Sequence, residues 1–354
     1  MSLLLTGSTG FFGGYLLKDL RNKFEAETYG EDFKLYLLVR PKHLNRLKKK
    51  FSDDSRIVLV SGDISNPDII DDDELATKIS KEITDIIHCA ALYDLKGRYG
   101  QCFMFNVVGT QNVVYFAKKC KKLERFHYTS TIAVAGNHTG FFPEDRLQLG
   151  QKHFDHYAKT KYDAELLVRE ADLKASKLIY RLGVLVGDTE SGNIVKLDGP
   201  YYFLYLFKKW SKQLNILNYV KYLPMPFNPK AVFPIVPVDH CSKVMTIAAG
   251  NEKFNQDKCY HLISDSCPTM EQFAGECLAA FDVNVKTIAI PKVKNIGKVL
   301  DKIGLPHQLL TYMYTKVSYD IHNYKNDFDQ VEKCEWDNYK DVMFEYVKNN
   351  EEPS

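Results

Sequence analysis

The chain has 354 residues, of which 45% are hydrophobic and 26% are charged, and this usage is typical of a folded globular protein and excludes intrinsic disorder. The 47 Lys and Arg residues nearly balance the 45 Asp and Glu residues, which argues against a dedicated nucleic-acid-binding protein with a concentrated basic face. Aromatic residues make up 13% of the chain, and so much ring surface must line a core, an apolar pocket or a membrane-facing patch.

Eight cysteines are scattered along the chain without a Cys-x-x-Cys pair, so we expect reduced thiols and no metal site. No apolar run approaches the ~18 residues that a membrane span needs. The first residues also lack the basic and apolar regions of a signal peptide. These features together predict a cytoplasmic protein.

Short apolar runs alternate with longer amphipathic stretches through the first half of the chain. Runs rich in Val, Ile and Leu that are separated by helices are typical of a parallel sheet covered on both faces. The predicted fold class is therefore α/β, with a doubly wound parallel sheet. The expected strands are Ser2–Thr6, Lys34–Val39, Arg56–Ser61, Asp85–Cys89, Arg125–Ser130 and Lys177–Arg181, and the expected helices include Gly13–Phe24, Val107–Cys120 and Tyr157–Glu170.

The first expected strand runs into Gly7-Ser8-Thr9-Gly10-Phe11-Phe12-Gly13 and then into a helix. Glycines at this spacing permit a tight turn and a close approach of the backbone to a pyrophosphate, and the helix N-terminus directs unpaired N–H groups at the phosphates. An ordinary turn between strand and helix is the alternative. Because the motif lies at the first strand, in the strand–turn–helix context, we predict that it binds a nucleotide.

The residues after the second expected strand bear on the choice of dinucleotide. A fold that prefers NAD places an acid there to bind the ribose 2′-hydroxyl, whereas this chain has Arg40, followed by further basic residues. A guanidinium suits a 2′-phosphate, so NADP(H) is the preferred cofactor, with NAD(H) as the alternative and a solvated basic helix face as the other interpretation. After the third strand, Asp63 is expected to accept the adenine amino group or to cap a helix.

Tyr157 and Lys161 lie one turn apart on an expected helix, so the phenol and the ammonium share a face. A neighbouring lysine favours the phenolate and is expected to lower the pKa of the tyrosine toward a range useful at a carbonyl. Upstream, the strand expected over Arg125–Ser130 ends in the hydroxyl-bearing run Tyr128-Thr129-Ser130-Thr131, at the edge where open α/β sheets bind ligands. A cap or turn is the alternative role for such hydroxyls.

The alternation of strands and helices ends near Gly187. We expect a dinucleotide-binding domain over residues 1–186, to which a strand and a helix near 232–250 return, and mainly a smaller, aromatic-rich substrate-binding lobe over 187–322. Residues 323–354 carry nine acidic and four basic side chains and are expected to form a surface helix with a frayed end.

Nine of the 27 residues from 201 to 227 are aromatic, and four lysines are interleaved with them. Three interpretations stay open and do not exclude one another: core packing, an apolar pocket for an acyl chain, and a patch that contacts a membrane peripherally. After Arg181 the chain has no arginine, the residue that best clamps a diphosphate. Its absence favours a lipid-like or thioester substrate over a sugar nucleotide.

Seven motifs follow one another along the chain. They are Thr6-Gly7-x-x-Gly10-x-x-Gly13, Gly62-Asp63, His88-Cys89-Ala90-Ala91, Asn106-x-x-Gly109-Thr110, Thr129-Ser130-Thr131, Tyr157-x-x-x-Lys161 and Val236-Pro237-Val238-Asp239. With this combination the chain resembles the extended short-chain dehydrogenase/reductases, a Rossmann-type family, over about residues 1–290. The runs Leu38–Arg40, Tyr128–Gly136 and Lys196–Phe203 make it most similar to the fatty acyl-CoA reductase and thioester-reductase branch.

The resemblance implies a role for each matching position. Tyr157 is implied as the acid/base, Lys161 as the residue that holds the nicotinamide ribose, and Thr131 as the partner hydroxyl, with Ser130 as the alternative. Leu182 departs from the family, in which many relatives carry a proline at this place. The implied cofactor-binding residues are Thr6, Gly7, Thr9, Gly10, Phe11, Phe12, Gly13, Arg40, Asp63, Ile64, Ala90, Ala91, Asn106, Tyr157, Lys161, Leu182, Gly183 and Val184.

The resemblance further implies an NADPH-dependent oxidoreductase that reduces a fatty acyl thioester or a fatty aldehyde by hydride transfer. A sterol or other hydroxy-lipid dehydrogenase and a sugar-nucleotide epimerase or dehydratase are alternatives with the same fold. A dinucleotide-binding regulatory protein without turnover is the alternative from another class. The expected partner is a lipid-like small molecule, without nucleic acid or metal, and a homodimer is left open.

Overall fold

The computed structural model describes residues 1–26, 33–95, 97–214, 218–291, 301–302 and 305–353. Its strands are β1 (Ser2–Thr6), β2 (Lys34–Val39), β3 (Ile57–Ser61), β4 (Asp85–His88), β5 (Arg125–Thr131), β6 (Thr139–Phe142), β7 (Ser176–Leu182), β8 (Val184–Val186), β9 (Tyr222–Met225), β10 (Ile235–Pro237), β11 (Lys258–Leu262), β12 (Lys286–Ala289) and β13 (Lys316–Tyr319). Seven of them form one parallel sheet in the order β11-β7-β5-β4-β1-β2-β3. The strand order reverses at β1, so the prediction of a doubly wound parallel sheet is confirmed.

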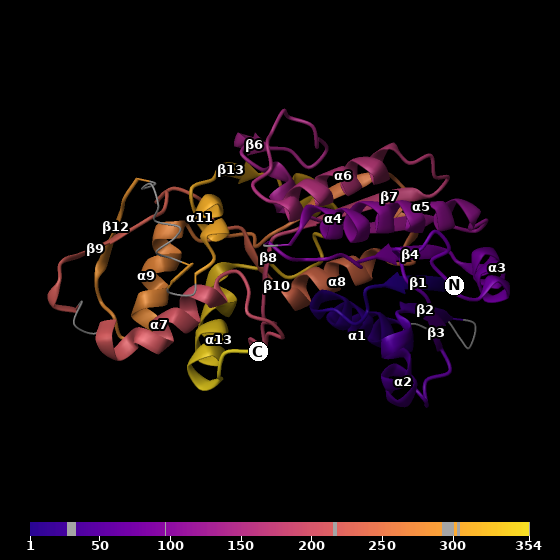
Figure 1. The fold of residues 1–354 in the computed structure, drawn as a ribbon, viewed down its shortest axis with the longest axis horizontal. Helices are drawn as coiled ribbons and strands as arrows, with labels where there is room; N and C mark the ends of the chain where they lie inside the picture. Colours follow the sequence, from indigo (N-terminus) through magenta and orange to yellow (C-terminus); the bar gives the residue numbers. More distant parts are fainter. Residues whose placement is uncertain (27–32, 96, 215–217, 292–300, 303–304, 354) are drawn as a thin grey trace.

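Helices cover both faces of this sheet, as Figure 1 shows with α4, α5 and α6 above it and α1 and α8 below it. Successive side chains of a strand point to opposite faces, so Leu3 and Leu5 pack in one hydrophobic cluster and Leu4 packs in the other. Unbroken apolar runs are therefore needed to fill both layers.

The helices are α1 (Phe11–Ala26), α2 (Pro41–Lys50), α3 (Asp73–Glu82), α4 (Tyr99–Cys102), α5 (Gly109–Lys119), α6 (His156–Glu170), α7 (Tyr201–Leu214), α8 (Val238–Ala248), α9 (Met270–Ala280), α11 (His307–Met313), α12 (His322–Asp327) and α13 (Trp336–Asn349), with the short segments η2 (Phe103–Val108), η3 (Ile132–Ala135) and η5 (Glu252–Phe254).

The expected elements agree with the observed ones to within two residues, but one of them has a start that the sequence did not predict. The helix expected to begin at Val107 is preceded by α4 and by η2, a π-helical segment, before it continues as α5. A π-helical turn widens the backbone spacing, and such turns are frequent at functional sites. Its residue Asn106 is buried and belongs to the site described below.

The chain leaves the large sheet after β7 and later returns to it. Helix α8 packs against α1, and β11 then adds a strand beside β7. The returning part therefore extends beyond the expected 232–250 to Leu262. The other part of the second half contains α7, α9, β9 and β12, which Figure 1 shows to one side of the sheet. Within the described residues, no helix is long and apolar enough to cross a bilayer.

The C-terminal helix α13 exposes its charged face and packs its other face against the rest of the molecule. One face of α13 is buried in the same hydrophobic cluster as α7, and Trp336 Nε1 donates a hydrogen bond of 2.6 Å to Glu276 Oε2. The excess of acidic residues belongs to the exposed positions, while the apolar residues recur at helical spacing. The buried residues of α13 are Trp336, Tyr339, Met343, Phe344 and Val347.

Candidate active site

The glycine turn between β1 and α1 has the shape that the sequence predicts. Gly7 has a φ of 81°, and a Cβ atom there would lie 2.7 Å from the amide nitrogen of Ala90. A Cβ atom on Gly13 would lie 2.1 Å from the carbonyl oxygen of Gly7, so only glycine fits at these two positions. The hydroxyl of Ser8 is buried and finds no hydrogen-bond partner within the described chain. An open backbone and an unpartnered donor at a helix N-terminus fit a bound phosphate group.

The other residues expected in the turn are Thr6, Thr9, Gly10, Phe11 and Phe12. Thr6 Oγ1 lies 2.8 Å from His88 Nδ1 and accepts a hydrogen bond of 3.2 Å from the amide of Ala90. It therefore joins the ends of β1 and β4, where the expected residues Ala90 and Ala91 follow. Gly10 closes the turn with a bond of 3.0 Å from its amide to the carbonyl of Gly7. Phe11 and Phe12 begin α1, and Thr9 is exposed in front of it.

Arg40 lies exposed at the end of β2, directly before α2. No carboxylate of the described chain pairs with its guanidinium, so the group is available to an anionic ligand. Asp63 follows β3, and its Oδ1 accepts hydrogen bonds of 2.9 and 2.8 Å from the amide and hydroxyl of Ser65. No helix begins at this turn, so the alternative of a helix cap is wrong for Asp63. Its neighbour Ile64 is buried against Gly109.

Asn106 anchors the loop that follows β4. Its Oδ1 accepts a bond of 2.7 Å from the amide of Leu92, and its Nδ2 donates to the Leu92 carbonyl at 3.1 Å and to Thr160 Oγ1 at 3.0 Å. The side chain thus ties this loop to helix α6. Asn106 therefore supports the loop beside the candidate site, and it lies in the π-helical segment η2, a kind of turn that is frequent at functional sites.

Thr131 and Tyr157 meet at the carboxyl end of β5. Tyr157 is the second residue of α6, whose N-terminus is capped by Asp155, and its phenol lies beside the hydroxyl of Thr131. The neighbouring Ser130 points to the opposite side of the strand, where its hydroxyl donates a bond of 2.6 Å to Glu165 Oε2. Because successive side chains of a strand alternate, Thr131 is the hydroxyl beside Tyr157 and Ser130 serves the buried interior.

Lys161 is buried one turn after Tyr157, and its Nζ donates a bond of 2.6 Å to the carbonyl of Thr129. The ammonium also lies 4.3 Å from the ring centre of Tyr128. Burial lowers the pKa of Lys161 to about 7.

The expectation that Lys161 lowers the pKa of Tyr157 is wrong for this structure. Burial raises the pKa of Tyr157 above its ordinary value, the hydroxyl of Thr131 beside it opposes that rise, and the charges of Asp155 and Asp198 add to it. The ammonium of Lys161 is directed at a backbone carbonyl instead of the phenol. The phenol is therefore held in its protonated form.

Three more residues border Tyr157 to which the sequence motifs assign no role. Tyr93, in the loop after β4, presents its ring edge-on to Tyr157 at 4.8 Å between ring centres. Its hydroxyl donates a bond of 2.8 Å to Asp198 Oδ1. Tyr312 of α11 donates to the carboxylate of Asp155. These residues come from loops and from the second half of the chain, so no short-range spacing connects them with Tyr157.

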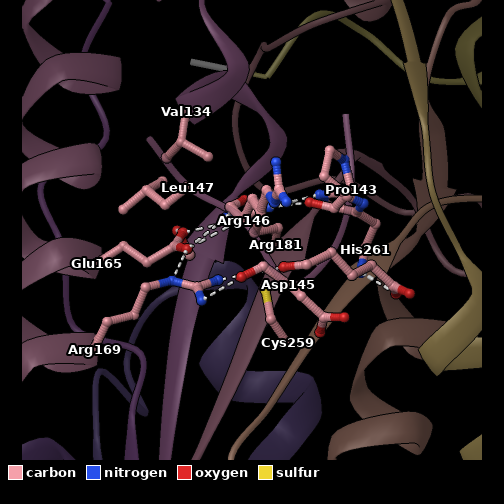
Figure 2. Close-up of polar contacts among 12 residues, drawn as sticks. Val134, Pro143, Asp145, Arg146, Leu147, Glu165, Arg169, Arg181, Cys259 and His261 are labelled. Atoms are coloured by element: carbon pink, nitrogen blue, oxygen red, sulfur yellow. Dashed lines mark hydrogen bonds and ion pairs between the residues drawn. The ribbon is translucent and has the colours of Figure 1, made fainter. Parts of the chain in front are cut away.

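Behind Ser130 lies a buried ion pair between Glu165 of α6 and Arg181 of β7. Arg181 Nη2 donates to Glu165 Oε1 at 2.7 Å and to the carbonyl of Arg146 at 2.8 Å, and Figure 2 shows the guanidinium among these groups. Burial alone would raise the pKa of Glu165, but the charges and hydrogen bonds of Arg181 and Arg169 lower it to about 2. The pair therefore remains charged in the interior.

The expected residues Leu182, Gly183 and Val184 follow at the end of β7. Gly183 donates a bond of 2.8 Å to the carbonyl of Leu262, and a Cβ atom on it would lie 2.5 Å from the carbonyl oxygen of Pro234. Val184 donates to the same carbonyl of Pro234 at 2.8 Å. The backbone here is therefore held by β11 and by the segment before β10.

The aromatic segment 201–227 divides into buried and exposed side chains. Core packing accounts for Tyr201, Tyr205, Phe207 and Phe227, all of which lie in the main hydrophobic cluster. Other aromatic side chains of the segment are exposed: Trp210 by 44%, Tyr219 by 92% and Tyr222 by 43%. An acyl pocket and a peripheral membrane contact stay predictions. The described residues contain no group of three His, Cys, Asp or Glu side chains that could hold a metal ion.

The sequence matches a family model described as male sterility protein, an NAD-binding family, over residues 5–245. A linear gramicidin synthase protein of Brevibacillus parabrevis is 26% identical over 249 residues, which are 67% of this chain and 5% of the synthase protein. Probable fatty acyl-CoA reductase 5 of Arabidopsis thaliana is 31% identical over 169 residues, which are 40% of this chain and 33% of that protein. The chain thus spans a third or less of the length of these relatives.

Among solved structures, the fold is similar to the terminal R domain from the myxalamid PKS-NRPS biosynthetic pathway. The TM-score is 0.71 at 22% sequence identity, and the likeness covers 98% of this chain and 89% of that domain. At this identity the likeness shows the fold alone. The family match, in contrast, covers more than half of the chain. The chain therefore belongs to the male sterility family of NAD-binding proteins, in the fatty acyl-CoA reductase-like branch of the extended short-chain dehydrogenases/reductases.

Proposed function

We propose that this protein uses NADPH to reduce an acyl thioester, or the corresponding aldehyde, at the carbonyl carbon. The observation that carries the proposal is the meeting of Thr131 and Tyr157 at the carboxyl end of β5, with Lys161 one turn further along α6. This is the sheet edge at which open α/β folds bind their ligands. The reductase named among the relatives supports an acyl substrate.

The residues of the chain fit a dinucleotide along this edge. The glycine turn and the N-terminus of α1 would hold the pyrophosphate, Arg40 the 2′-phosphate, Asp63 the adenine and Lys161 the nicotinamide ribose. The bound cofactor supplies a hydride. The preference for NADPH over NADH rests on the exposed guanidinium of Arg40 and on the lack of an acid at the end of β2.

In the proposed reaction, Thr131 and Tyr157 donate hydrogen bonds to the carbonyl oxygen and so polarise the carbon–oxygen bond. The carbonyl carbon receives the hydride, the electron pair of the π bond moves to the oxygen, and that oxygen takes the phenolic proton of Tyr157. A thioester thereby becomes a hemithioacetal. Its hydroxyl proton then transfers to sulfur while the carbon–sulfur bond breaks, which releases an aldehyde and a thiol.

Burial and the carboxylates of Asp155 and Asp198 raise the pKa of Tyr157, so the phenol is protonated at neutral pH and can serve as the acid of the proposed reduction.

The proposed function is tested by measuring NADPH oxidation in the presence of acyl-CoA thioesters of graded chain length. The decrease in absorbance of the reduced nicotinamide monitors the reaction. We expect thioester-dependent oxidation that is faster with NADPH than with NADH, and matching aldehydes serve as the second substrate series. If the thioesters and aldehydes leave NADPH unchanged while sterols or other alcohols reduce NADP⁺, the protein is a hydroxy-lipid dehydrogenase. If the cofactor binds without turnover on any of these compounds, a regulatory role replaces the enzyme.

Replacing Arg40 with alanine is expected to weaken NADPH binding by about tenfold or more, since a charge-assisted hydrogen bond contributes about 1.5–3 kcal/mol. NADH lacks the 2′-phosphate, so its dissociation constant should change by less than about twofold. Fluorescence titration of both cofactors measures the effect. Lys42→Ala is the matched control, because Lys42 is also basic and exposed at the start of α2. Equal losses for the two cofactors would contradict the role of Arg40.

A further inference from the structure

A chain of contacts leads from the second half of the molecule to the catalytic tyrosine. Asp198 lies in the segment before α7, where its Oδ1 accepts a bond of 2.7 Å from the amide of Gly199 and one of 2.8 Å from the hydroxyl of Tyr93. The ring of Tyr93 then stands at 83° to the ring of Tyr157, with 4.8 Å between their centres. An edge-on pair at this distance is a favourable aromatic contact.

The hydrogen bond fixes Tyr93 at its far end and the aromatic contact fixes its ring. Tyr93 is otherwise poorly held, because 39% of the residue is exposed in the loop after β4. Without Asp198 the side chain of Tyr93 would regain its rotamer freedom. Asp198 thus determines how firmly Tyr93 supports the phenol beside it.

We propose that Asp198 is a positioning residue for the reaction: through Tyr93 it holds the phenol of Tyr157 in place against Thr131. The inference rests on the proposed function, because it concerns the residue that donates the proton in that reaction. It adds that the segment leading into α7 takes part in the alignment of the catalytic tyrosine. The two parts of the molecule therefore meet at the reacting group itself.

Three variants separate position from charge. Tyr93→Phe keeps the ring and removes its hydroxyl, Asp198→Asn keeps an acceptor oxygen and removes the charge, and Asp198→Ala removes both. We expect Tyr93→Phe and Asp198→Ala each to lower kcat by about tenfold, the worth of a hydrogen bond to a charged group, with the NADPH dissociation constant unchanged. The double variant should be no slower than the slower single variant, because both remove one contact chain. Asp198→Asn should keep most of kcat, because the amide oxygen can still accept the hydrogen bond of the Tyr93 hydroxyl. Tyr115→Phe, at an exposed tyrosine of α5, is the control with unchanged kcat.

A crystal structure of the Asp198→Ala protein gives a readout that does not depend on turnover. We expect Tyr93 to leave its present rotamer and the ring of Tyr157 to move away from Thr131. Unchanged positions of both rings, or losses of kcat that multiply in the double variant, would overturn the inference. If Tyr157→Phe keeps full activity, the proposed function fails instead. If Tyr157→Phe is inactive while Asp198→Ala and Tyr93→Phe are fully active, the inference alone fails.

Discussion

A Tyr157→Phe protein is expected to lose turnover by ~10²–10⁴-fold, the usual worth of general acid catalysis, while it still binds NADPH. The phenol of Tyr157 is held against Thr131, and its raised pKa keeps the proton available for the carbonyl oxygen. Phenylalanine preserves the ring and its edge-on contact with Tyr93. Steady-state kinetics with the best acyl thioester measure kcat, and fluorescence titration measures NADPH binding.

Tyr162→Phe on the same helix is the matched control for this experiment. Tyr162 packs instead against His153, with 4.5 Å between ring centres, so its variant should keep kcat to within about twofold. Thr131→Ala should also lose activity, and Thr131→Ser should retain most of it because the hydroxyl is kept. Full activity of Tyr157→Phe would show that another group donates the proton.

Patterns formed by residues close together in the sequence predicted the strands and helices of the dinucleotide-binding part well. The strands were found because each must be apolar along its whole length to fill two layers, and Leu3, Leu4 and Leu5 illustrate this requirement. The glycine turn and the pair of Tyr157 and Lys161 likewise depend on spacings of a few residues. Whether these residues carry out the proposed roles remains a prediction.

Features that depend on distant contacts could not be predicted in this way. Tyr93 and Asp198 are 105 residues apart, and Tyr312 and Asp155 are 157 residues apart, so no spacing connects them. The direction of the Lys161 ammonium depends on the carbonyl of the neighbouring strand, which the sequence of α6 does not contain. Similarly, counting acidic residues in the C-terminal segment predicted a surface helix, although its apolar residues recur at a spacing that buries one face.

The other large effect is expected in the interior, where Arg181→Met should lower the free energy of unfolding by about 3–5 kcal/mol. Arg181 and Glu165 are both fully buried, so loss of the guanidinium leaves an anion with Ser130 and Arg169 as its remaining partners. Urea unfolding followed by circular dichroism measures the loss. Because Arg181 and Arg169 hold the pKa of Glu165 at about 2 rather than 4.5, the carboxylate stabilises the fold above pH 4.5. Its contribution fades as pH falls toward 2, so the difference between the two proteins should shrink in that range.

Two further variants decide whether the charge of Glu165 causes this effect. Lys258 lies on the adjacent strand β11 and forms a partly exposed ion pair with Asp327 of α12. Lys258→Met removes this pair and should lower the free energy of unfolding by no more than about 1 kcal/mol. Adding Glu165→Gln to Arg181→Met removes the buried charge that has lost its Arg181 partner, so the double variant should be more stable than Arg181→Met alone. An equal or greater loss in the double variant would mean that packing of the arginine, and not its pairing with Glu165, stabilises the interior. The pairing also affects the candidate active site. Glu165 accepts a hydrogen bond from Ser130, and Ser130 directly precedes Thr131 on β5. The ion pair therefore holds the end of the strand that the proposed reaction uses.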